Sequence, residues 1–248
     1  MALYAVSDTH ISGPEDPLFR SLLALLRDRA RGGDTVVLAG DLFDLFVGNK
    51  KVFLERYRDF FVELRAAGLR GVRVHYIEGN HDFHLRRVFA HFPGVTLHAR
   101  EFEIVLEGRR FFFAHGDLVD RKDYGYRVLR LFFRSPLMRI AVALMPDSMV
   151  EWIGYQSAQA SKGAKHRLPV QLPAGRMEYL RGVYRNFAVE RMVRGADYVV
   201  MGHCHDLDEK SFVIGSRQGQ YVNVGFPRVH GSFLSWSPGD ERIQREKF

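Results

Sequence analysis

The sequence is poor in cysteine, since Cys204 is the only one among 248 residues. No disulfide can therefore form within the chain, which is typical of proteins in a reducing compartment. Long apolar runs are also missing, and no stretch approaches the roughly 18–20 residues that a membrane-spanning helix needs. Met1–Val6 is apolar but runs directly into Asp8, which is too short for a signal peptide. We therefore expect a cytoplasmic protein.

Acidic residues are fewer than basic ones, with 29 Asp and Glu against 36 Lys and Arg, and the formal net charge is +7. The excess is uneven. Residues 121–167 hold nine Lys and Arg but only three Asp and Glu. A basic segment of this kind suits phosphate groups, nucleic acid or an anionic membrane surface.

The pattern of apolar residues predicts an α/β fold. Short apolar strands at 3–6, 35–38 and 72–77 alternate with amphipathic helices at 18–31 and 53–64, which indicates βαβ units and a parallel sheet. The later segments predict a hairpin of 102–106 with 110–114 and a helix at 177–193. They also predict short strands at 198–201, 211–214, 221–224 and 232–236. We expect a four-layer α-β-β-α sandwich in a single domain of residues 1–248, with a helical cap insertion at about 121–175.

Polar side chains that can bind metals follow several predicted strands directly. They form five short clusters, namely Asp8-Thr9-His10, Gly40-Asp41, Gly79-Asn80-His81-Asp82, His115-Gly116 and Gly202-His203-Cys204-His205. Ligands of parallel sheets sit beyond the carboxyl ends of the strands, where the first three clusters lie. Carboxylate oxygen, amide oxygen and imidazole nitrogen suit Mn²⁺, Fe or Zn²⁺. Cys204 points away from its neighbours if the local chain is extended, so we interpret it as a packing residue.

Each cluster taken alone has an ordinary structural explanation. Gly-Asp after a strand is usually a turn, and a single histidine such as His115 is more often a hydrogen-bonded core residue than a ligand. The order of the clusters and their positions at strand ends together favour a site for two metal ions, because ions about 3.5–4 Å apart can share one activated water.

Together these clusters resemble the calcineurin-like metallophosphoesterases over most of the chain. The resemblance implies that Asp8, His10 and His205 hold one metal, that Asn80, His115 and His203 hold the other, and that Asp41 bridges them. It implies two divalent ions, with Mn²⁺ as first choice and Fe or Zn²⁺ as alternatives. His81 matches the catalytic histidine and Asp44 the carboxylate that orients it. The implied reaction is metal-assisted phosphoester hydrolysis, in which His81 protonates or stabilises the leaving oxygen.

Within this superfamily the chain is similar to the UDP-2,3-diacylglucosamine hydrolases of lipid A biosynthesis. The similarity lies in Gly40-Asp41-Leu42-Phe43 with Gly48, in His115-Gly116-Asp117 with Asp123-Tyr124-Gly125-Tyr126, and in Ala160-Ser161-Lys162. It implies a UDP-linked diacylated sugar as substrate, contacted by Asn80, His81, Asp123, Tyr126, Ser161, Lys162 and Lys165. The apolar and basic insertion suits acyl chains beside phosphates. It also suits peripheral binding to the anionic inner face of the bacterial inner membrane.

One departure leaves an alternative open. Many of those hydrolases have arginine where this chain has His81, and glutamate where it has Asp44. A His-Asp pair also handles poor alkoxide leaving groups, so a phosphodiesterase or phosphatase acting on nucleotides is the alternative. A nuclease of the same superfamily would fit the basic charge, but the apolar insertion and the lack of interleaved stacking aromatics make nucleic acid an unlikely partner. A non-catalytic scaffold is disfavoured because His81 and the full set of candidate ligands are present.

Overall fold

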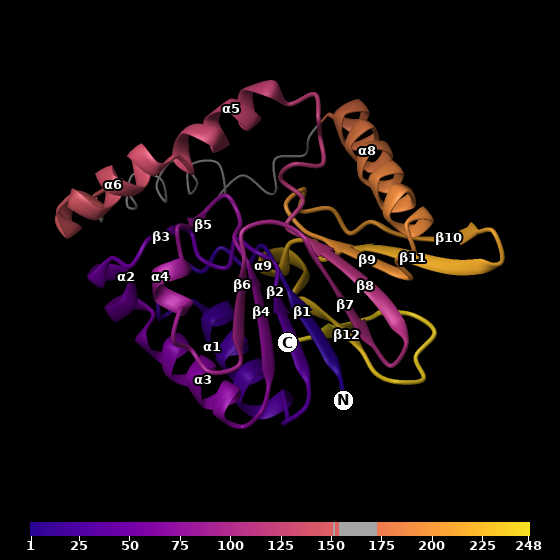
Figure 1. Cartoon of the computed structure of the whole chain (residues 1–248), viewed down its shortest axis with the longest axis horizontal. Coiled ribbons are helices and arrows are strands. Elements are labelled where there is room, and N and C mark those ends of the chain that lie inside the picture. The colour runs from indigo at the N-terminus through magenta and orange to yellow at the C-terminus, as the bar shows by residue number, and fades with distance from the viewer. Residues whose placement is uncertain (151, 154–172) are drawn as a thin grey trace.

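A six-stranded sheet in the order β13-β12-β1-β2-β4-β6 forms one half of the core (Figure 1). Its strands are β1 (Leu3–Val6), β2 (Thr35–Leu38), β4 (Arg73–Ile77), β6 (Val95–His98), β12 (Ser232–Trp236) and β13 (Gln244–Lys247). The first four run parallel, and Val6, Leu38 and Tyr76 are neighbours in the register. The loops that follow β1, β2 and β4 therefore leave the sheet at one edge. The structure is a computed structural model, and it describes residues 1–150, 152–153 and 173–248.

A five-stranded sheet in the order β10-β11-β9-β8-β7 forms the other half. Its strands are β7 (Phe102–Leu106), β8 (Arg109–Ala114), β9 (Tyr198–Met201), β10 (Glu209–Ile214) and β11 (Arg217–Asn223). The predicted hairpin is present as β7 and β8, which pair antiparallel. β8 and β9 are parallel, with Ala114 beside Met201, so the loops carrying the two later clusters also leave at a common edge.

Helices cover the outer faces of both sheets. On the first sheet lie α1 (Pro17–Ala24), the π-helical turn η1 (Leu25–Arg29), α2 (Lys51–Arg56) and α3 (Arg58–Leu69), and on the second lies α8 (Ala174–Val193). Side chains alternate along the strands as a buried sheet requires. Val36 packs with the helices, whereas Val37 packs with Val200 of the second sheet. The predicted α/β sandwich with layers α-β-β-α is confirmed.

Several elements were not anticipated from the sequence. The edge strand β13 is polar throughout, so it carries no alternation of apolar residues, and β6 is short and only half-buried. The pair β3 (Phe46–Val47) and β5 (Asp82–Phe83) and the short helices α4 (Arg86–Phe89) and α9 (Pro227–His230) lie within segments for which the sequence predicted no helix or strand. They hold the loops beside the candidate ligands in fixed positions.

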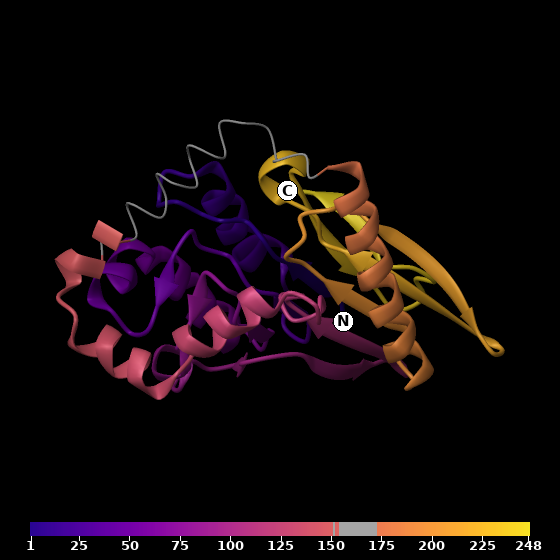
Figure 2. The ribbon, with the colours of Figure 1, turned by 90° about the horizontal axis from the view of Figure 1, so that it is seen from above.

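The described part of the insertion is helical, as predicted, and is interrupted just before Pro136. α5 (Tyr124–Phe133) ends before α6 (Pro136–Leu144), which has Ser135 as its N-cap. Figure 2 shows the two helices from above, and Lys50 at the start of α2 reaches the carbonyl of Ala143 in α6. No helix in the described residues is both long and apolar enough to cross a bilayer.

Two arginines fasten α5 to the strand-end loops. Arg130 donates to the Asp117 carboxylate across 2.6 Å, after β8. Arg134 donates to Glu78 across 2.7 Å and to the carbonyl oxygen of Gly79 across 2.8 Å, after β4. The contacts to Asp117 and Glu78 are ion pairs between largely buried side chains. The insertion is therefore held directly beside the clusters that precede it in the sequence.

Candidate metal centre

The first group of candidate ligands lies between the loops after β1 and β9. One ligand atom from each of Asp8, His10 and His205 lies within 4.8 Å of the others. The Nε2 atoms of His10 and His205 are 3.2 Å apart, and Nε2 of His205 is 3.4 Å from the Asp8 carboxylate. Phe226 stacks on the ring of His205, with centroids 4.4 Å apart, and so fixes its orientation.

The second group lies between the loops after β2, β4, β8 and β9. Ligand atoms of Asp41, His115 and His203 again lie within 4.8 Å of one another. The Asn80 side-chain oxygen is 3.0 Å from Nε2 of His115 and 3.0 Å from Nδ1 of His203. Nδ1 of His115 lies 3.0 Å from the carbonyl oxygen of Ala39. A carbonyl can only accept, so Nδ1 carries a proton and Nε2 is the nitrogen that faces the group and would bind a metal once its own proton leaves.

Asp41 belongs to the second group and also faces the first. Its Oδ2 is 3.5 Å from Nε2 of His115 and 3.9 Å from Nε2 of His10. Its Oδ1 accepts a hydrogen bond of 2.9 Å from the backbone N–H of His81. One carboxylate oxygen is thus held by the backbone while the other faces both histidine clusters, which is the arrangement that a bridging ligand requires.

The backbone is strained at most of the candidate ligands. Among the described residues, seven other than glycine have positive φ, and five of them are Asp8, His10, Asp41, His203 and His205. A left-handed conformation costs a non-glycine residue on the order of 1–3 kcal/mol and persists only where the surroundings impose it. Such strain gathers at functional sites, and here it turns the side chains of consecutive loop residues toward one point.

Close backbone approach explains glycines next to the ligands. A Cβ on Gly79 would lie 2.2 Å from Oδ1 of Asp41, and one on Gly202 would lie 2.2 Å from Oδ2 of Asp8. Both distances are far below van der Waals contact. The two carboxylates can therefore reach their positions only because these neighbouring residues have no side chain.

The electrostatics of the buried groups fit a cation. Burial alone would raise the pKa of Asp41, but the adjacent His115 and His81 hold it well below its usual value. Burial alone would lower the pKa of His115, but Asp41 outweighs it and the pKa rises to about 10. Burial lowers the pKa of His10 to about 3 and that of His203 to about 4. His10 and His203 are therefore neutral and ready to bind a metal, whereas the carboxylate of Asp41 favours a positive charge at His115, which a divalent cation would supply in place of a proton.

His10 has a buried polar atom without a hydrogen-bond partner in the described part of the chain, its Nδ1. The nearest carboxylate oxygen belongs to Asp44, at 4.0 Å. A cation on Nε2 of His10 would fix the proton on Nδ1, where it faces that carboxylate. The residues present therefore fit two divalent ions.

His81 forms a third group with His10 and Asp41, whose ligand atoms lie within 4.8 Å of one another, and Asp44 meets it through the main chain. Nδ1 of His81 is 2.8 Å from the backbone carbonyl oxygen of Asp44, so Nδ1 donates and Nε2 is the free nitrogen. The ring of His81 packs edge-on against that of His10. The carboxylate of Asp44 lies instead 4.0 Å from Nδ1 of His10. The expected carboxylate contact to His81 is therefore replaced by a carbonyl contact that fixes the same tautomer.

Asp82 organises the centre, and we did not single it out from the sequence. It is fully buried. Its Oδ1 accepts from the N–H groups of Gly79 and Asp41 at 2.6 and 3.1 Å, and its Oδ2 from Leu42 N–H at 3.1 Å and Tyr76 O–H at 2.7 Å. Burial, reinforced by Asp41, raises its pKa to about 7. The only sequence signal was its place beside His81 after a buried strand.

We expect Asp82→Ala to lower the free energy of unfolding by at least about 3 kcal/mol, because each buried donor left unpaired costs roughly 1–3 kcal/mol. Tyr76→Phe is the matched control, since it removes a single donor and leaves the carboxylate with its backbone partners. Urea denaturation followed by circular dichroism measures both. Equal losses in the two variants would show that Asp82 does not hold the loops together.

The expected substrate contacts fall in three places. Asp123 is the N-cap of α5 and accepts from Tyr126 N–H at 2.9 Å. The Tyr126 hydroxyl donates to Asp117 at 2.6 Å, and its ring lies 5.8 Å from that of His203, so Tyr126 borders the centre. Ser161, Lys162 and Lys165 lie outside the described residues. Cys204 joins none of the ligand groups found in the described chain, and its sulfur accepts from the Asn223 amide at 3.1 Å.

The chain is similar in sequence to a family of known proteins. The profile of the calcineurin-like phosphoesterases matches residues 1–207. A UDP-2,3-diacylglucosamine hydrolase of Aeromonas salmonicida (strain A449) is 29% identical over 260 residues, covering 99% of this chain and 93% of the relative. One of Shigella sonnei (strain Ss046) is 25% identical over 244 residues, 98% of each chain. A solved archaeal phosphodiesterase aligns over 100% of both chains at 12% identity, with a TM-score of 0.44.

Proposed function

Because this chain belongs to the calcineurin-like phosphoesterase family, whose members are metal-dependent hydrolases, we propose that it cleaves UDP-2,3-diacylglucosamine to UMP and 2,3-diacylglucosamine 1-phosphate. The observation that carries the hydrolytic part of the proposal is the position of Asp41, with one oxygen facing both ligand groups. The choice of substrate is supported by relatives named for that reaction, which align with nearly the whole chain.

In this proposal Asp8, His10 and His205 hold one divalent ion, and Asn80, His115 and His203 hold the other. Asp41 bridges them, and Mn²⁺ is the first choice for both. When bound, two such ions would supply an activated water as nucleophile and would neutralise charge on the phosphoryl oxygens. The chain itself fixes the ligand atoms within 4.8 Å of one another in each group, so little reorganisation is needed when the ions bind.

We assign His81 to the leaving group. Its Nδ1 donates to the carbonyl of Asp44, so in the imidazolium form Nε2 carries the second proton and can give it, or a hydrogen bond, to the departing oxygen. In the proposed reaction that oxygen belongs to a sugar phosphate. Such a group leaves readily, so the role of His81 is chiefly to stabilise its negative charge. Asp44 positions the ring through its main chain and faces His10 with its carboxylate.

The insertion supports a lipid substrate. Val150 is buried and Val142 and Met145 pack partly against the core, but most apolar side chains in the described part of the segment are exposed. Those of α5 and α6 include Val128, Leu131, Leu137, Ile140 and Leu144. Burial of each CH₂ contributes about 0.8 kcal/mol, so long acyl chains would gain much by covering this surface. We propose that it binds acyl chains and rests on an anionic leaflet, with Asp123, Tyr126, Ser161, Lys162 and Lys165 near the head group.

A second candidate function follows from His81 itself. An imidazolium whose Nδ1–H is held by a carbonyl can transfer its Nε2 proton to an alkoxide, which a substrate with a phosphate leaving group does not require. The alternative proposal is therefore a phosphodiesterase or phosphatase for nucleotides. The two candidate functions use the same metal centre. They differ in whether acyl chains cover the exposed apolar surface of α5 and α6.

We expect the purified protein with Mn²⁺ to release UMP from UDP-2,3-diacylglucosamine, and to lose this activity on chelation. Release of UMP is followed by chromatography, with the water-soluble UDP-N-acetylglucosamine as a matched substrate that lacks the acyl chains. Preference for the acylated substrate supports the lipid assignment. If the metal-loaded protein cleaves alkyl phosphodiesters but releases no UMP from either sugar nucleotide, the alternative function replaces the first.

A further inference from the structure

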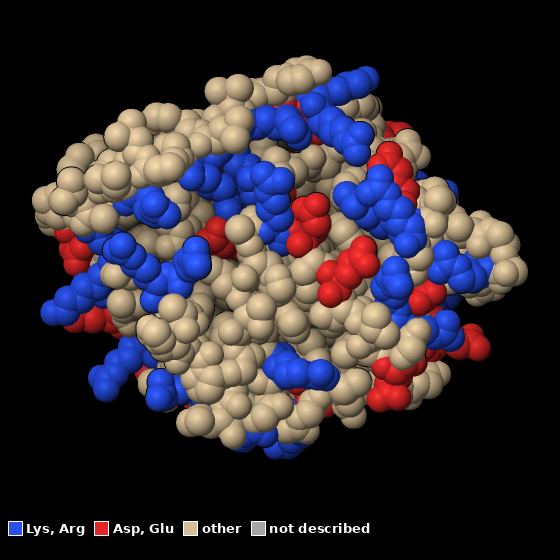
Figure 3. Space-filling view, in the orientation of Figure 1, with Lys and Arg blue, Asp and Glu red and all other residues tan. Residues whose placement is uncertain are grey.

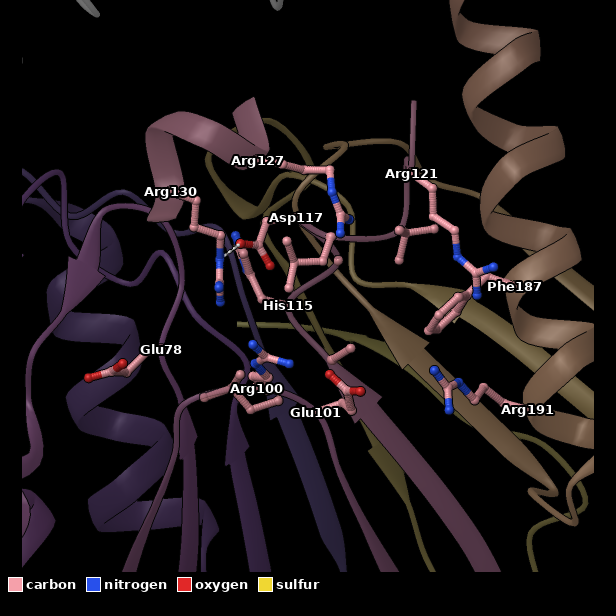
Figure 4. Close-up of a pocket in the computed structure, with 15 residues that line it drawn as sticks. Glu78, Arg100, Glu101, His115, Asp117, Arg121, Arg127, Arg130, Phe187 and Arg191 are labelled. Carbon is pink, nitrogen blue, oxygen red and sulfur yellow. Dashed lines mark hydrogen bonds and ion pairs between the residues drawn. The ribbon is translucent and has the colours of Figure 1, made fainter. Parts of the chain in front are cut away.

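A cavity opens beside the candidate metal centre, between the loop after β8, the start of β7, α5 and α8 (Figure 4). Its volume is about 180 Å³. A single water needs only roughly 10–15 Å³ on this scale, so the cavity has room for a group of several heavy atoms. His115 and Asp117 form part of its wall, but none of the functions assigned above uses it.

Arginine dominates the charge of this cavity. Its wall contains five arginines, at 100, 121, 127, 130 and 191, against three acidic residues, at 78, 101 and 117. Two of the acids already have partners, because Glu78 pairs with Arg134 outside the wall and Asp117 pairs with Arg130. Figure 3 shows Lys and Arg side chains gathered beneath α5 on this face of the molecule. The cavity therefore carries a positive charge that the described chain does not neutralise.

Two of the arginines are available to a ligand. Arg100, in the loop before β7, and Arg127, on α5, have no hydrogen bond or ion pair from their side chains to any other described residue. In Figure 4 they approach the cavity from opposite sides, Arg127 from the α5 side and Arg100 from the strand side. Arg121 has only an exposed contact of 3.4 Å to Glu190.

Arg191 is preorganised in the same wall. Its guanidinium stacks on Phe187 and on Phe112, at 4.5 and 4.8 Å from the ring centroids. Its Nε is buried and has no hydrogen-bond partner among the described residues. A buried donor without a partner costs roughly 1–3 kcal/mol, so an acceptor in this region would relieve that cost. The stacking holds the planar fork in place before any ligand arrives.

We infer that this cavity is a binding site for a phosphate group, separate from the metal centre. Several arginine forks directed into one small space match the oxygens of a phosphate dianion in number and geometry. The room available is too small for a nucleic-acid duplex, and a single aromatic side chain, Phe187, lines it. The phosphate group could come from inorganic phosphate or from a nucleoside monophosphate. The second source rests on the proposed function, and the first does not.

The test is calorimetric titration of inorganic phosphate into the full-length, metal-loaded protein. We expect the wild type to bind phosphate at two sites, the metal centre and the cavity. The double variant Arg100→Ser/Arg127→Ser is expected to lose the cavity site, with at least a tenfold weaker affinity there, and to keep the other. Arg109→Ser, an exposed arginine at the start of β8 and outside the cavity, is the matched control and should keep both.

Asp41→Asn separates this inference from the proposed function. We expect it to lose phosphate binding at the metal centre while the cavity site persists, whatever reaction the centre performs. Competition in that variant identifies the source: displacement of phosphate by UMP indicates a nucleotide, and failure of UMP to compete indicates free phosphate. Equal binding by the wild type and the double arginine variant, or loss of all phosphate binding in Asp41→Asn, would overturn the inference.

Discussion

Asp41→Asn is expected to abolish hydrolysis, with a loss well beyond the roughly 10- to 100-fold that follows from removing a residue that only orients a metal ligand. The two oxygens of Asp41 have different tasks, since Oδ1 accepts from His81 N–H and Oδ2 faces His10 and His115. The asparagine NH₂ must take one of these places. It would face either a backbone donor or the cations, and both contacts are repulsive. Steady-state hydrolysis and metal content after dialysis measure the effect.

Asp59→Asn is the control for this prediction, because Asp59 is exposed on α3 and makes the same change of charge. It should keep full activity and metal content. A substantial rate for Asp41→Asn with both metals retained would show that Asp41 does not bridge them.

His81→Ala is expected to lower kcat by about 10²–10⁴-fold on a phosphodiester with an alkyl leaving group, the usual contribution of a positioned acid. The loss should be much smaller with p-nitrophenolate, which needs no proton. The free Nε2 of His81 is the group removed, while the ligand atoms of both metal groups stay in place. The ratio of the two rates is the measurement, and it is insensitive to a general loss of folded protein.

His81→Arg and His91→Ala complete this experiment. Arginine can stabilise a departing phosphate but cannot donate a proton, so we expect His81→Arg to act on the sugar nucleotide and to fail on the alkyl diester. His91 is exposed and should be replaceable without effect. An equal loss on both leaving groups in His81→Ala would contradict the assignment and indicate a structural role.

The fold and the positions of the candidate ligands could be predicted because one physical rule governs both. Parallel strands such as Leu3–Val6 and Thr35–Leu38 are short, apolar and buried, and residues that follow them meet at one edge of the sheet. Polar residues placed there, including Asp8 and Asp41, were therefore expected to lie together, and the structure brings them together.

The supporting contacts could not be predicted because they join residues that are distant in the sequence through ordinary side chains. Arg228 on α9 donates to the carbonyl oxygen of His10 across 2.6 Å, and Arg130 and Arg134 fasten α5. No feature of the neighbouring sequence distinguishes these arginines from arginines that are exposed to solvent. Asp44 shows the same limit, because its spacing from Asp41 suggested a carboxylate contact to His81, whereas the backbone geometry supplies a carbonyl.

The central claim is that the two ligand groups hold two cations joined by Asp41. Anomalous diffraction from crystals grown with Mn²⁺ tests it most directly. We predict two peaks about 3.5–4 Å apart, one next to Asp8, His10 and His205, the other next to Asn80, His115 and His203, with Asp41 between them. A single peak, or two peaks of which neither contacts Asp41, would contradict it.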